Sequence, residues 1–334
     1  MRLLTIAIPT CNRCESLKKT LTHTLNTINQ LNLTHDVAVL SIDNGSVDKT
    51  AIYMEELSVF DNFSYIKNEQ NIGFDRNILK CLEESQTKYV WIIQDHTRII
   101  PNGLINIIEQ IGKGEFSFCF APIPGDVEWI LKAYAYKSQG VAYLNTMINT
   151  NIFNRDLILR YYNEFLQQID GCWLVYRIAN LVAIYESMTM AVGVIPVACS
   201  EYGAFRVGNE REKNSWSSDW VTYVRVWYFA GKIIDYMQVK YGISDIFFTK
   251  ITEPRIKKYN LESLYTYLNL RLNNIQNALP REVAEQIAKN PLYNEFERIL
   301  FCIIISGNEK EVKGLCESGI LRDYHNLLIA SQQL

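Results

Sequence analysis

The sequence has few features of nucleic-acid-binding, membrane-spanning or secreted proteins. Its 334 residues carry a net charge of −3 and no concentrated basic face, which disfavours a nucleic-acid partner. No window holds the ~18 to 20 uncharged apolar residues of a membrane-spanning helix. The nearest window, 181–199, is interrupted by Glu186 and Pro196. The apolar start is too short for a secretion signal and has no small-residue cleavage site, so we expect a cytoplasmic protein with at most peripheral membrane contact.

Cysteine and histidine also lack the spacing of a disulfide scaffold or a zinc site. The eight cysteines are scattered along the chain, and the four histidines are dispersed. Cys11 and Cys14 form a C-x-x-C, which leaves two interpretations: a redox or metal-binding pair, or a chance occurrence. A zinc site would need a second such pair or nearby histidines, so the second interpretation is favoured.

Strand and helix patterns alternate over the first 120 residues. Short apolar runs predict strands at 3–8, 37–42, 63–66, 89–93 and 116–120. Helical periodicity predicts helices at 16–30, 48–57 and 77–84. Strands that are apolar on both faces and alternate with helices are typical of a parallel sheet covered on both sides. The predicted fold class is therefore α/β, with a doubly wound, mainly parallel sheet.

The pattern loosens beyond residue 122 and becomes helical toward the end of the chain. In the middle part we expect helices at 156–165 and 172–185 and a strand at 190–198. Helices are then expected at 261–272, 282–288, 294–305, 310–318 and 323–334. A helical C-terminal region of this kind either docks on the rest of the chain or mediates dimerisation, so a homo-oligomer is an open possibility.

Polar residues follow the predicted strands in four segments. These segments are 9–13, 43–46, 68–74 and 94–97. Ligands of doubly wound sheets bind beyond the carboxyl ends of the strands, so we expect the four segments to share one edge. Asp43 can accept two hydrogen bonds from a base or ribose there, or it can simply cap the next helix, with Asn44 and Gly45 as turn residues.

The third and fourth segments contain further candidates. Gly73 allows a ligand to approach the backbone closely, and Arg76 can face a phosphate; the alternative is a plain helix start with Arg76 in solvent. Asp95 can hold a divalent ion that bridges two phosphates, and His96 is a usable metal ligand. Alternatively, Asp95 and Thr97 only cap a turn.

Taken in order, these motifs resemble the family 2 glycosyltransferases with the GT-A fold. The stretches that carry the resemblance are Leu4–Arg13, Ile42–Thr50, Asn68–Phe74 and Trp91–Thr97. An aromatic residue commonly stands where this chain has Cys11, which makes the C-x-x-C a coincidence. The resemblance implies that Asp43 reads the base of a nucleotide-sugar. It implies a donor site made of Pro9, Thr10, Asn12, Arg13, Asp43, Asn44, Gly45, Asn71, Gly73, Phe74, Arg76 and Asp95.

The resemblance also implies a divalent cation, Mn²⁺ or Mg²⁺, bound by Asp95 and His96. The chain departs from the family pattern at Thr97, where members commonly carry a metal-binding aspartate. A threonine hydroxyl is a neutral and weaker ligand. Three hypotheses follow: Asp95 and His96 hold the metal alone, the enzyme works without metal, or catalysis has been lost. We favour retained activity with atypical or weak metal dependence.

An inverting transfer needs a general base that deprotonates the acceptor hydroxyl. The resemblance assigns this role to Asp170, at the start of the predicted helix 172–185, although an N-cap is an equally simple interpretation. Weaker candidates for the base are Glu128, Glu201 and Asp219. Tyr202 and Arg206, near Glu201, are expected to form part of a lid, an acceptor contact or a plain surface loop.

The predicted function is inverting transfer of a sugar from a nucleotide-sugar, UDP-linked, to a hydroxyl of a glycan. The resemblance implies assembly of bacterial surface polysaccharide, capsule or lipopolysaccharide, on a glycan or lipid-linked glycan acceptor at the cytoplasmic membrane face.

Residues 1–121 are the expected nucleotide-sugar-binding half, 122–245 the acceptor-binding and catalytic half, and 246–334 the helical region. The alternative function is a catalytically silent nucleotide-binding or scaffold protein. A nucleotidyltransferase is disfavoured because its basic, glycine-rich phosphate loop is absent after the first strand.

Overall fold

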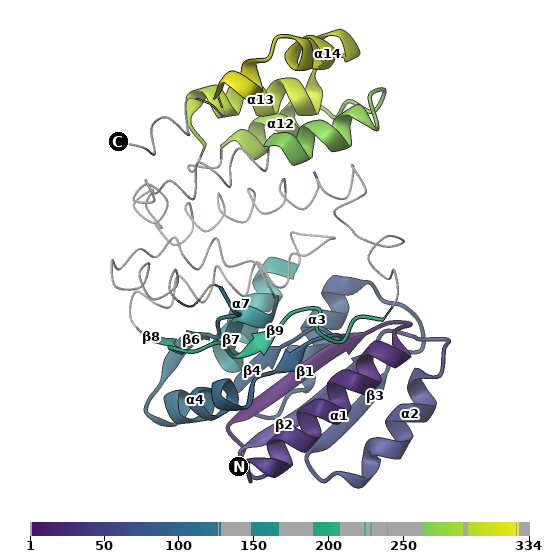
Figure 1. Ribbon diagram of the computed structural model, residues 1–334, viewed down its shortest axis with the longest axis vertical. Helices are drawn as coiled ribbons and strands as arrows, with labels where there is room; N and C mark the ends of the chain where they lie inside the picture. The colour runs from purple at the N-terminus through teal and green to yellow at the C-terminus, as the bar shows by residue number, and fades with distance from the viewer. Residues whose placement is uncertain are drawn as a thin grey trace. The chain divides into compact units, whose positions relative to one another are not determined.

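The computed structural model describes most of the first 125 residues and several later segments (Figure 1). The described residues are 2–125, 127, 148–166 (backbone alone from 161), 190–207, 224, 228, 239, 264–289, 293–324 and 326. The chain folds into two compact units, Met1–Glu210 and Arg211–Leu334. Among the described residues, no helix is both long and apolar enough to cross a membrane.

The first unit is built on a seven-stranded sheet with the order β3-β2-β1-β4-β7-β6-β8. Its strands are β1 (Leu4–Thr10), β2 (Val37–Asp43), β3 (Phe63–Lys67), β4 (Tyr89–Ile92), β6 (Phe116–Phe120), β7 (Asn151–Asn154) and β8 (Ala191–Val194). β7 runs antiparallel to both of its neighbours, and the other pairings are parallel. The mainly parallel α/β fold predicted from the sequence is therefore confirmed. A second, two-stranded antiparallel sheet joins β5 (Arg98–Ile99) to β9 (Ser200–Glu201).

Helices cover both faces of the large sheet (Figure 1). They are α1 (Cys14–Gln30), α2 (Thr50–Glu56), α3 (Phe74–Glu84), α4 (Pro101–Gly112) and α7 (Arg155–Leu166), with 3₁₀ turns at Leu57–Val59 and Ile148–Thr150. α1, α2 and α4 bury apolar residues in one cluster with the sheet, whereas α3 lies against β1, β2 and β4 from the other face and contacts α7. The alternation of strand and helix thus produces the three layers of a doubly wound domain.

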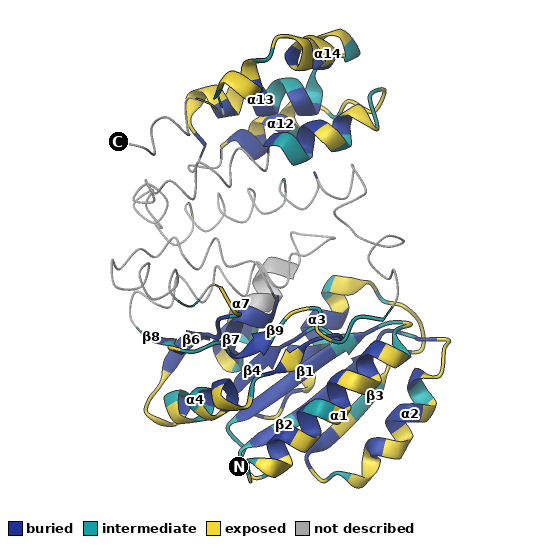
Figure 2. Ribbon diagram, in the orientation of Figure 1, coloured by how far each residue is buried: buried dark blue, intermediate teal, exposed yellow. Residues whose placement is uncertain are grey.

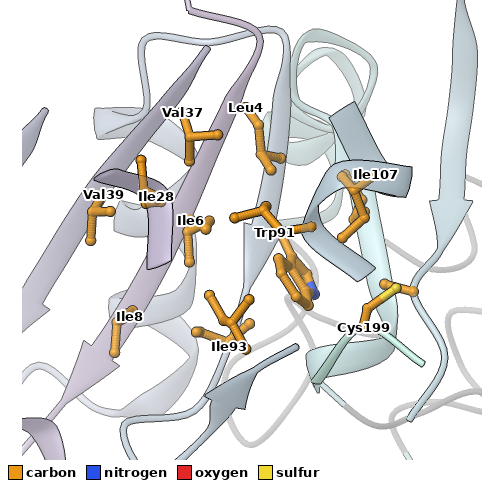
Figure 3. Packing of buried hydrophobic residues seen from close by; sticks show 14 of the residues in the cluster. Leu4, Ile6, Ile8, Ile28, Val37, Val39, Trp91, Ile93, Ile107 and Cys199 are labelled. Atoms are coloured by element: carbon orange, nitrogen blue, oxygen red, sulfur yellow. The ribbon is translucent and has the colours of Figure 1, made fainter. Parts of the chain in front are cut away.

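The core of this unit forms where alternate strand residues meet α1 and α4 (Figure 3). Leu4, Ile6 and Trp91 are fully buried in it, and Figure 2 shows the central strands of the sheet mostly buried behind helices with exposed outer faces. Burial of a side chain of this size contributes about 1.5–3 kcal/mol. The indole Nε1 of Trp91 donates a 2.6 Å hydrogen bond to the carbonyl of Asn149, which satisfies its one polar atom.

α4 and β7, which belong to the layers of the large sheet, are missing from the sequence prediction. α4 begins at Pro101 in a Pro-Asn-Gly stretch that is typical of a turn, but proline is also favoured at the first position of a helix. β7 has only four residues with an asparagine at each end, so its apolar centre, Ile152 and Phe153, is too short to stand out. Both elements depend on burial against the rest of the sheet.

The second unit is helical where it is described. Residues 264–272 form a helix, followed by α12 (Arg281–Ala288), α13 (Glu295–Ser306) and α14 (Glu309–Glu317), and these elements share one apolar cluster. Asn294 and Asn308 each begin a helix with a capping box, in which the asparagine side chain and a glutamate three residues later satisfy exposed backbone N–H groups. The predicted helices 282–288, 294–305 and 310–318 are confirmed. The predicted helix 172–185, and most of 323–334, lie outside the described residues.

Candidate active site

The strand order reverses between β1 and β4. The chain enters the sheet at β1, adds β2 and β3 on one side, and then crosses to β4 on the other side. In doubly wound sheets, the crevice for a ligand opens at this reversal, beyond the carboxyl ends of the strands. The residues that follow β1 and β4 are therefore the first to consider.

Asp95 lies at this reversal and is held from two sides. Thr10, the last residue of β1, donates a hydrogen bond of 2.8 Å to Asp95 Oδ2, and Arg13 donates one of 3.2 Å to Oδ1. The Asp95 side chain is 4% exposed, whereas that of Arg13 is 36% exposed. Burial raises the pKa of Asp95, but the hydrogen bond from His96 and the charge of Arg13 outweigh it, so the pKa lies below its ordinary value. Asp95 is thus a buried carboxylate beneath a partly exposed guanidinium.

His96 continues this network toward a distant part of the chain. Its Nδ1 lies 3.0 Å from Asp95 Oδ1, and its Nε2 lies 3.2 Å from the guanidinium Nη2 of Arg206. A guanidinium can only donate, so Nε2 is the acceptor and the proton lies on Nδ1, which donates to Asp95. The ring of Tyr202 packs on His96 at a centroid distance of 5.2 Å, and the Tyr202 hydroxyl accepts a 2.9 Å hydrogen bond from Arg206.

Direct hydrogen bonds connect the loops after β1 and β2. The backbone N–H of Asn12 donates to Ser46 Oγ at 2.8 Å, and Asn12 Oδ1 accepts from the N–H of Val47 at 2.9 Å. Asn12 has a φ of 54°, a left-handed conformation that asparagine tolerates better than most residues. Pro9 lies within β1, beside Ile42 of β2. The first two predicted binding segments are therefore one connected structure.

Asp43 is fully buried at the end of β2. Its Oδ1 accepts the backbone N–H of Ser46 and its Oδ2 accepts the hydroxyl of Tyr65, both at 2.8 Å. Burial, together with the hydrogen bond to this carboxylate, raises the pKa of Tyr65. A nucleotide base therefore meets Asp43 only if Tyr65 turns aside, and in the described arrangement Asp43 shapes the loop.

Asn44 and Gly45 join the second binding segment to the third. Asn44 Nδ2 donates to Asn71 Oδ1 at 2.9 Å, and Asn44 Oδ1 accepts the N–H of Ile72 at 2.9 Å. Gly45 has a φ of +73°, and a Cβ there would lie 2.5 Å from the carbonyl carbon of Gln70. Only glycine fits at this close approach of two backbones.

The start of α3 presents the remaining donor-site candidates. Gly73 precedes the helix with a φ of +86°, and a Cβ there would meet nothing within 4 Å. Asn71 and Arg76 are exposed, and Phe74 is 36% exposed. These side chains are exposed to solvent beside the hydrogen-bonded loops, which is where side chains that contact a ligand are expected.

Cys11 and Cys14 are free thiols. Cys11 Sγ lies 3.4 Å from the carbonyl oxygen of Asn44, and the N–H of Cys14 donates to Asp48. Burial, followed by the charges of nearby carboxylates, raises the pKa of both thiols. A raised pKa reduces the thiolate fraction and does not favour redox or metal chemistry.

The predicted general base lies outside the described residues, as do several alternatives. Asp170, Glu128, Asp219 and the segment 208–217 belong to this group. Glu201 is described, and it accepts hydrogen bonds from two nitrogens of Arg98, one of them at 3.0 Å. That ion pair joins β5 to β9.

Sequence reasoning did not find three contacts at this edge: Arg206 with His96, Tyr65 with Asp43, and Asn149 with Thr97. The Nδ2 of Asn149 donates a 3.0 Å hydrogen bond to Thr97 Oγ1, and Thr97 is fully buried. The partners are separated by 22 to 110 positions. No local pattern encodes pairings across such separations.

The family of the chain follows from a comparison with family models. The model described as Glycosyl transferase family 2 matches residues 5–181, more than half of the 334 residues. The chain belongs to this family and is a glycosyltransferase. No curated protein matches the chain.

Solved S. aureus TarS structures have a similar fold. The S. aureus TarS structure of residues 1–349 in complex with UDP-GlcNAc has a TM-score of 0.53 and 14% identity, covering 95% of this chain and 92% of that one. A longer S. aureus TarS structure has a TM-score of 0.55 and 14% identity, covering 95% of this chain and 55% of that one. A Pyrobaculum calidifontis mannosyltransferase in complex with GDP-Man and Mn²⁺ has a TM-score of 0.49 and 11% identity, covering 98% and 84%.

The side chains at the expected metal position do not fit a divalent cation in this arrangement. Both oxygens of Asp95 already accept hydrogen bonds, and the Nε2 lone pair of His96 accepts one from Arg206. Thr97 is buried and paired with Asn149. Among the described residues, no three His, Cys, Asp or Glu side chains form a group able to hold a metal. Mg²⁺ and Mn²⁺ prefer carboxylate and water oxygens, and this position offers one carboxylate beside two guanidinium groups.

Proposed function

We propose that the chain transfers a sugar from a nucleotide-sugar, UDP-linked, to a hydroxyl of a glycan acceptor, with inversion at the anomeric carbon. The observation that supports the proposal is the set of hydrogen-bonded loops that follow β1, β2 and β4 at one edge of the sheet. The chain that carries them belongs to glycosyl transferase family 2. Asn12, Ser46, Asn44 and Asn71 join its loops, and Arg13 supplies a partly exposed positive charge. A preformed site of this kind suits an anionic nucleotide.

UDP is proposed because TarS, which has a similar fold, is described in complex with UDP-GlcNAc. The base would lie toward Asn44, Asn71 and Tyr65, and the diphosphate toward Arg13. A guanidinium recognises phosphate oxygens through parallel N–H donors and stays charged at all physiological pH values.

The chemical step breaks the bond between the anomeric carbon and the oxygen of the β-phosphate. The acceptor oxygen forms the new bond to that carbon from the opposite face, and the electron pair of the broken bond goes to the departing diphosphate. The acceptor hydroxyl gives its proton to a general base, which we assign to Asp170. The Mn²⁺ or Mg²⁺ that the family resemblance implies has no step in this proposal.

The biological setting is part of the proposal. We infer that the acceptor is a glycan or lipid-linked glycan of bacterial surface polysaccharide, such as capsule or lipopolysaccharide, assembled at the inner face of the cytoplasmic membrane. The support is the family resemblance of the first 97 residues. Fractionation of cells that express the chain would test the location.

Calorimetric titration of UDP and GDP, each with and without Mn²⁺, tests the donor site. Micromolar binding of UDP supports the proposal. Tighter binding of GDP than of UDP would mean that the donor carries a guanine nucleotide and not a uracil nucleotide. If neither nucleotide binds in any condition, the donor site fails and a silent scaffold becomes the better hypothesis.

A pair of matched variants tests the assigned base. Asp170→Asn is expected to lower turnover by about 100-fold or more, because general base catalysis typically contributes that much. Its affinity for UDP should stay within about twofold, since a general base acts on the acceptor hydroxyl and not on the donor nucleotide. Asp156→Asn makes the same change at an exposed position on α7 and should keep wild-type turnover. Full activity of Asp170→Asn would contradict the assignment.

A further inference from the structure

We infer that Arg13 and Arg206 neutralise the donor's diphosphate in place of a divalent cation, with Asp95 and His96 as the buried residues that position them. This inference rests on the proposed function, because it names the groups that meet the phosphates of the donor. It assigns a role to Arg206, which the sequence places among lid or surface-loop residues.

The two arginines converge on one buried pair. Arg13 Nη1 lies 3.2 Å from Asp95 Oδ1, and Arg206 Nη2 lies 3.2 Å from His96 Nε2. Asp95 and His96 are joined to each other at 3.0 Å. The two guanidinium groups therefore lie at the two ends of one hydrogen-bonded chain, although Arg206 lies 110 positions from His96 in the sequence.

Burial separates the positioning residues from the ligand-facing ones. The side chains of Asp95 and His96 are 4% and 5% exposed, whereas Arg13 is 36% exposed and Arg206 is also partly exposed. A phosphate that arrives at this edge meets guanidinium nitrogens before it meets a carboxylate. A guanidinium has five N–H donors in one plane, and the contacts of Arg206 with His96 and Tyr202 both use Nη2.

The segment around Arg206 is anchored. The N–H of Phe205 donates to the carbonyl of His96 at 3.1 Å, and the N–H of Val207 donates to Ser16 Oγ at 3.2 Å. Arg206 itself is held by Tyr202, whose hydroxyl accepts at 2.9 Å and whose ring lies 5.2 Å from the guanidinium carbon. Contacts of this kind reduce the side-chain entropy lost on binding a ligand.

The two arginines bring positive charge to this position without a metal. Both guanidinium groups lie within hydrogen-bond distance of the Asp95 and His96 pair, and a guanidinium stays charged at all physiological pH values. As the bond to the anomeric carbon breaks, the β-phosphate oxygen gains negative charge, and fixed positive groups nearby stabilise that change.

Titrations of UDP and UMP, in EDTA and in Mn²⁺, test the inference on the full chain. Wild type should bind UDP in EDTA within about threefold of its affinity in Mn²⁺. Arg206→Met should weaken UDP by about tenfold or more, since a hydrogen bond to a charged group is lost, and weaken UMP by less than about threefold. Arg13→Met should show the same preferential loss, and Arg206→Lys should recover part of the UDP affinity.

The control is Arg2→Met, which removes the same charge near the opposite end of β1, where Arg2 donates to the carbonyl of Thr34. It should bind UDP as wild type does. UDP binding that requires Mn²⁺, or equal UDP affinity in Arg206→Met and wild type in EDTA, would overturn the inference and leave the proposed function standing. Absence of UDP and GDP binding in every condition would overturn both.

Discussion

The hydroxyl of Thr10 donates a 2.8 Å hydrogen bond to Asp95 Oδ2, and this contact joins the ends of β1 and β4 at the reversal of the strand order. Both residues are buried, at 4% and 3% exposure. The hydrogen bond therefore links the conformation of the loop that carries Arg13 to the position of Asp95. Its removal should affect stability and ligand binding together.

Thr10→Val keeps the shape of the side chain and removes its hydroxyl. We expect the free energy of unfolding to fall by about 1.5–3 kcal/mol, because a buried carboxylate loses a hydrogen bond. Thr10→Ser keeps the hydroxyl, so its free energy of unfolding should fall by less than that of Thr10→Val. Urea unfolding of both variants and wild type measures the difference. Equal midpoints for Thr10→Val and wild type would show that the contact contributes little.

The lowered pKa of Asp95 predicts a specific pH dependence. A group whose pKa is lower in the folded state stabilises the protein above its unfolded pKa, and the stabilisation is lost as the pH falls through the folded pKa. The stability of wild type relative to Asp95→Asn should therefore be constant between about pH 5 and 8 and decrease below about pH 4, the ordinary range of an aspartate. Unfolding curves measured across this range would contradict the prediction if the difference grew at low pH.

Gly45 and Gly73 form a matched pair, since both have a positive φ at the donor edge. A Cβ at Gly45 would lie 2.5 Å from Gln70 and 2.7 Å from Asn71, whereas one at Gly73 would meet nothing within 4 Å. Gly73→Ala should lower the free energy of unfolding by about 1–3 kcal/mol from backbone strain alone, because its φ of 86° and ψ of 160° lie in a region that glycine almost alone adopts. Gly45→Ala should lower it further, because steric overlap with the backbone of Gln70 adds to the strain. A smaller loss at Gly45 in urea unfolding would mean that the two loops separate readily.

Much of this fold is predictable because the strands are apolar on both faces. Leu4, Ile6 and Ile8 pack on one side of β1 and Ala7 is buried on the other, so the strand is visible as a continuous apolar run. Once a parallel sheet is inferred, the strand ends must share an edge, which brings Thr10, Arg13 and Asp95 together as expected. β7 escapes prediction because polar asparagines, one of them bonded to the carbonyl of Phe116, bound its two apolar residues.

The sequence says less about what the site residues do. Asp43 has the position of a base-reading aspartate, but its two oxygens accept from Ser46 and Tyr65. His96 has the chemistry of a metal ligand, but Arg206 takes its free lone pair. These roles depend on partners that no local spacing reveals. The predicted role of Asp170 stays a prediction.

The buried position of Thr97 gives the last prediction. The family resemblance places Thr97 where members commonly carry a metal-binding aspartate, so Thr97→Asp would restore the pattern that the resemblance implies. Thr97 is fully buried, and its hydroxyl accepts from Asn149 at 3.0 Å. The new carboxylate would lie in the interior near Asp95, where a charge without a compensating partner is strongly unfavourable. We expect a lower melting temperature and no gain in Mn²⁺ dependence.

Thr97→Asn is the matched control, because asparagine has nearly the size of aspartate without its charge. Melting temperatures of both variants, with and without Mn²⁺, separate the effect of size from that of charge. If Mn²⁺ raises the melting temperature of Thr97→Asp alone and makes its UDP affinity dependent on Mn²⁺, the edge admits a cation once a second acid is present. The two arginines would then be compatible with a metal, and their role as its replacement would have to be abandoned. If Mn²⁺ changes neither variant, the geometry around Asp95 excludes the cation irrespective of the residue at position 97.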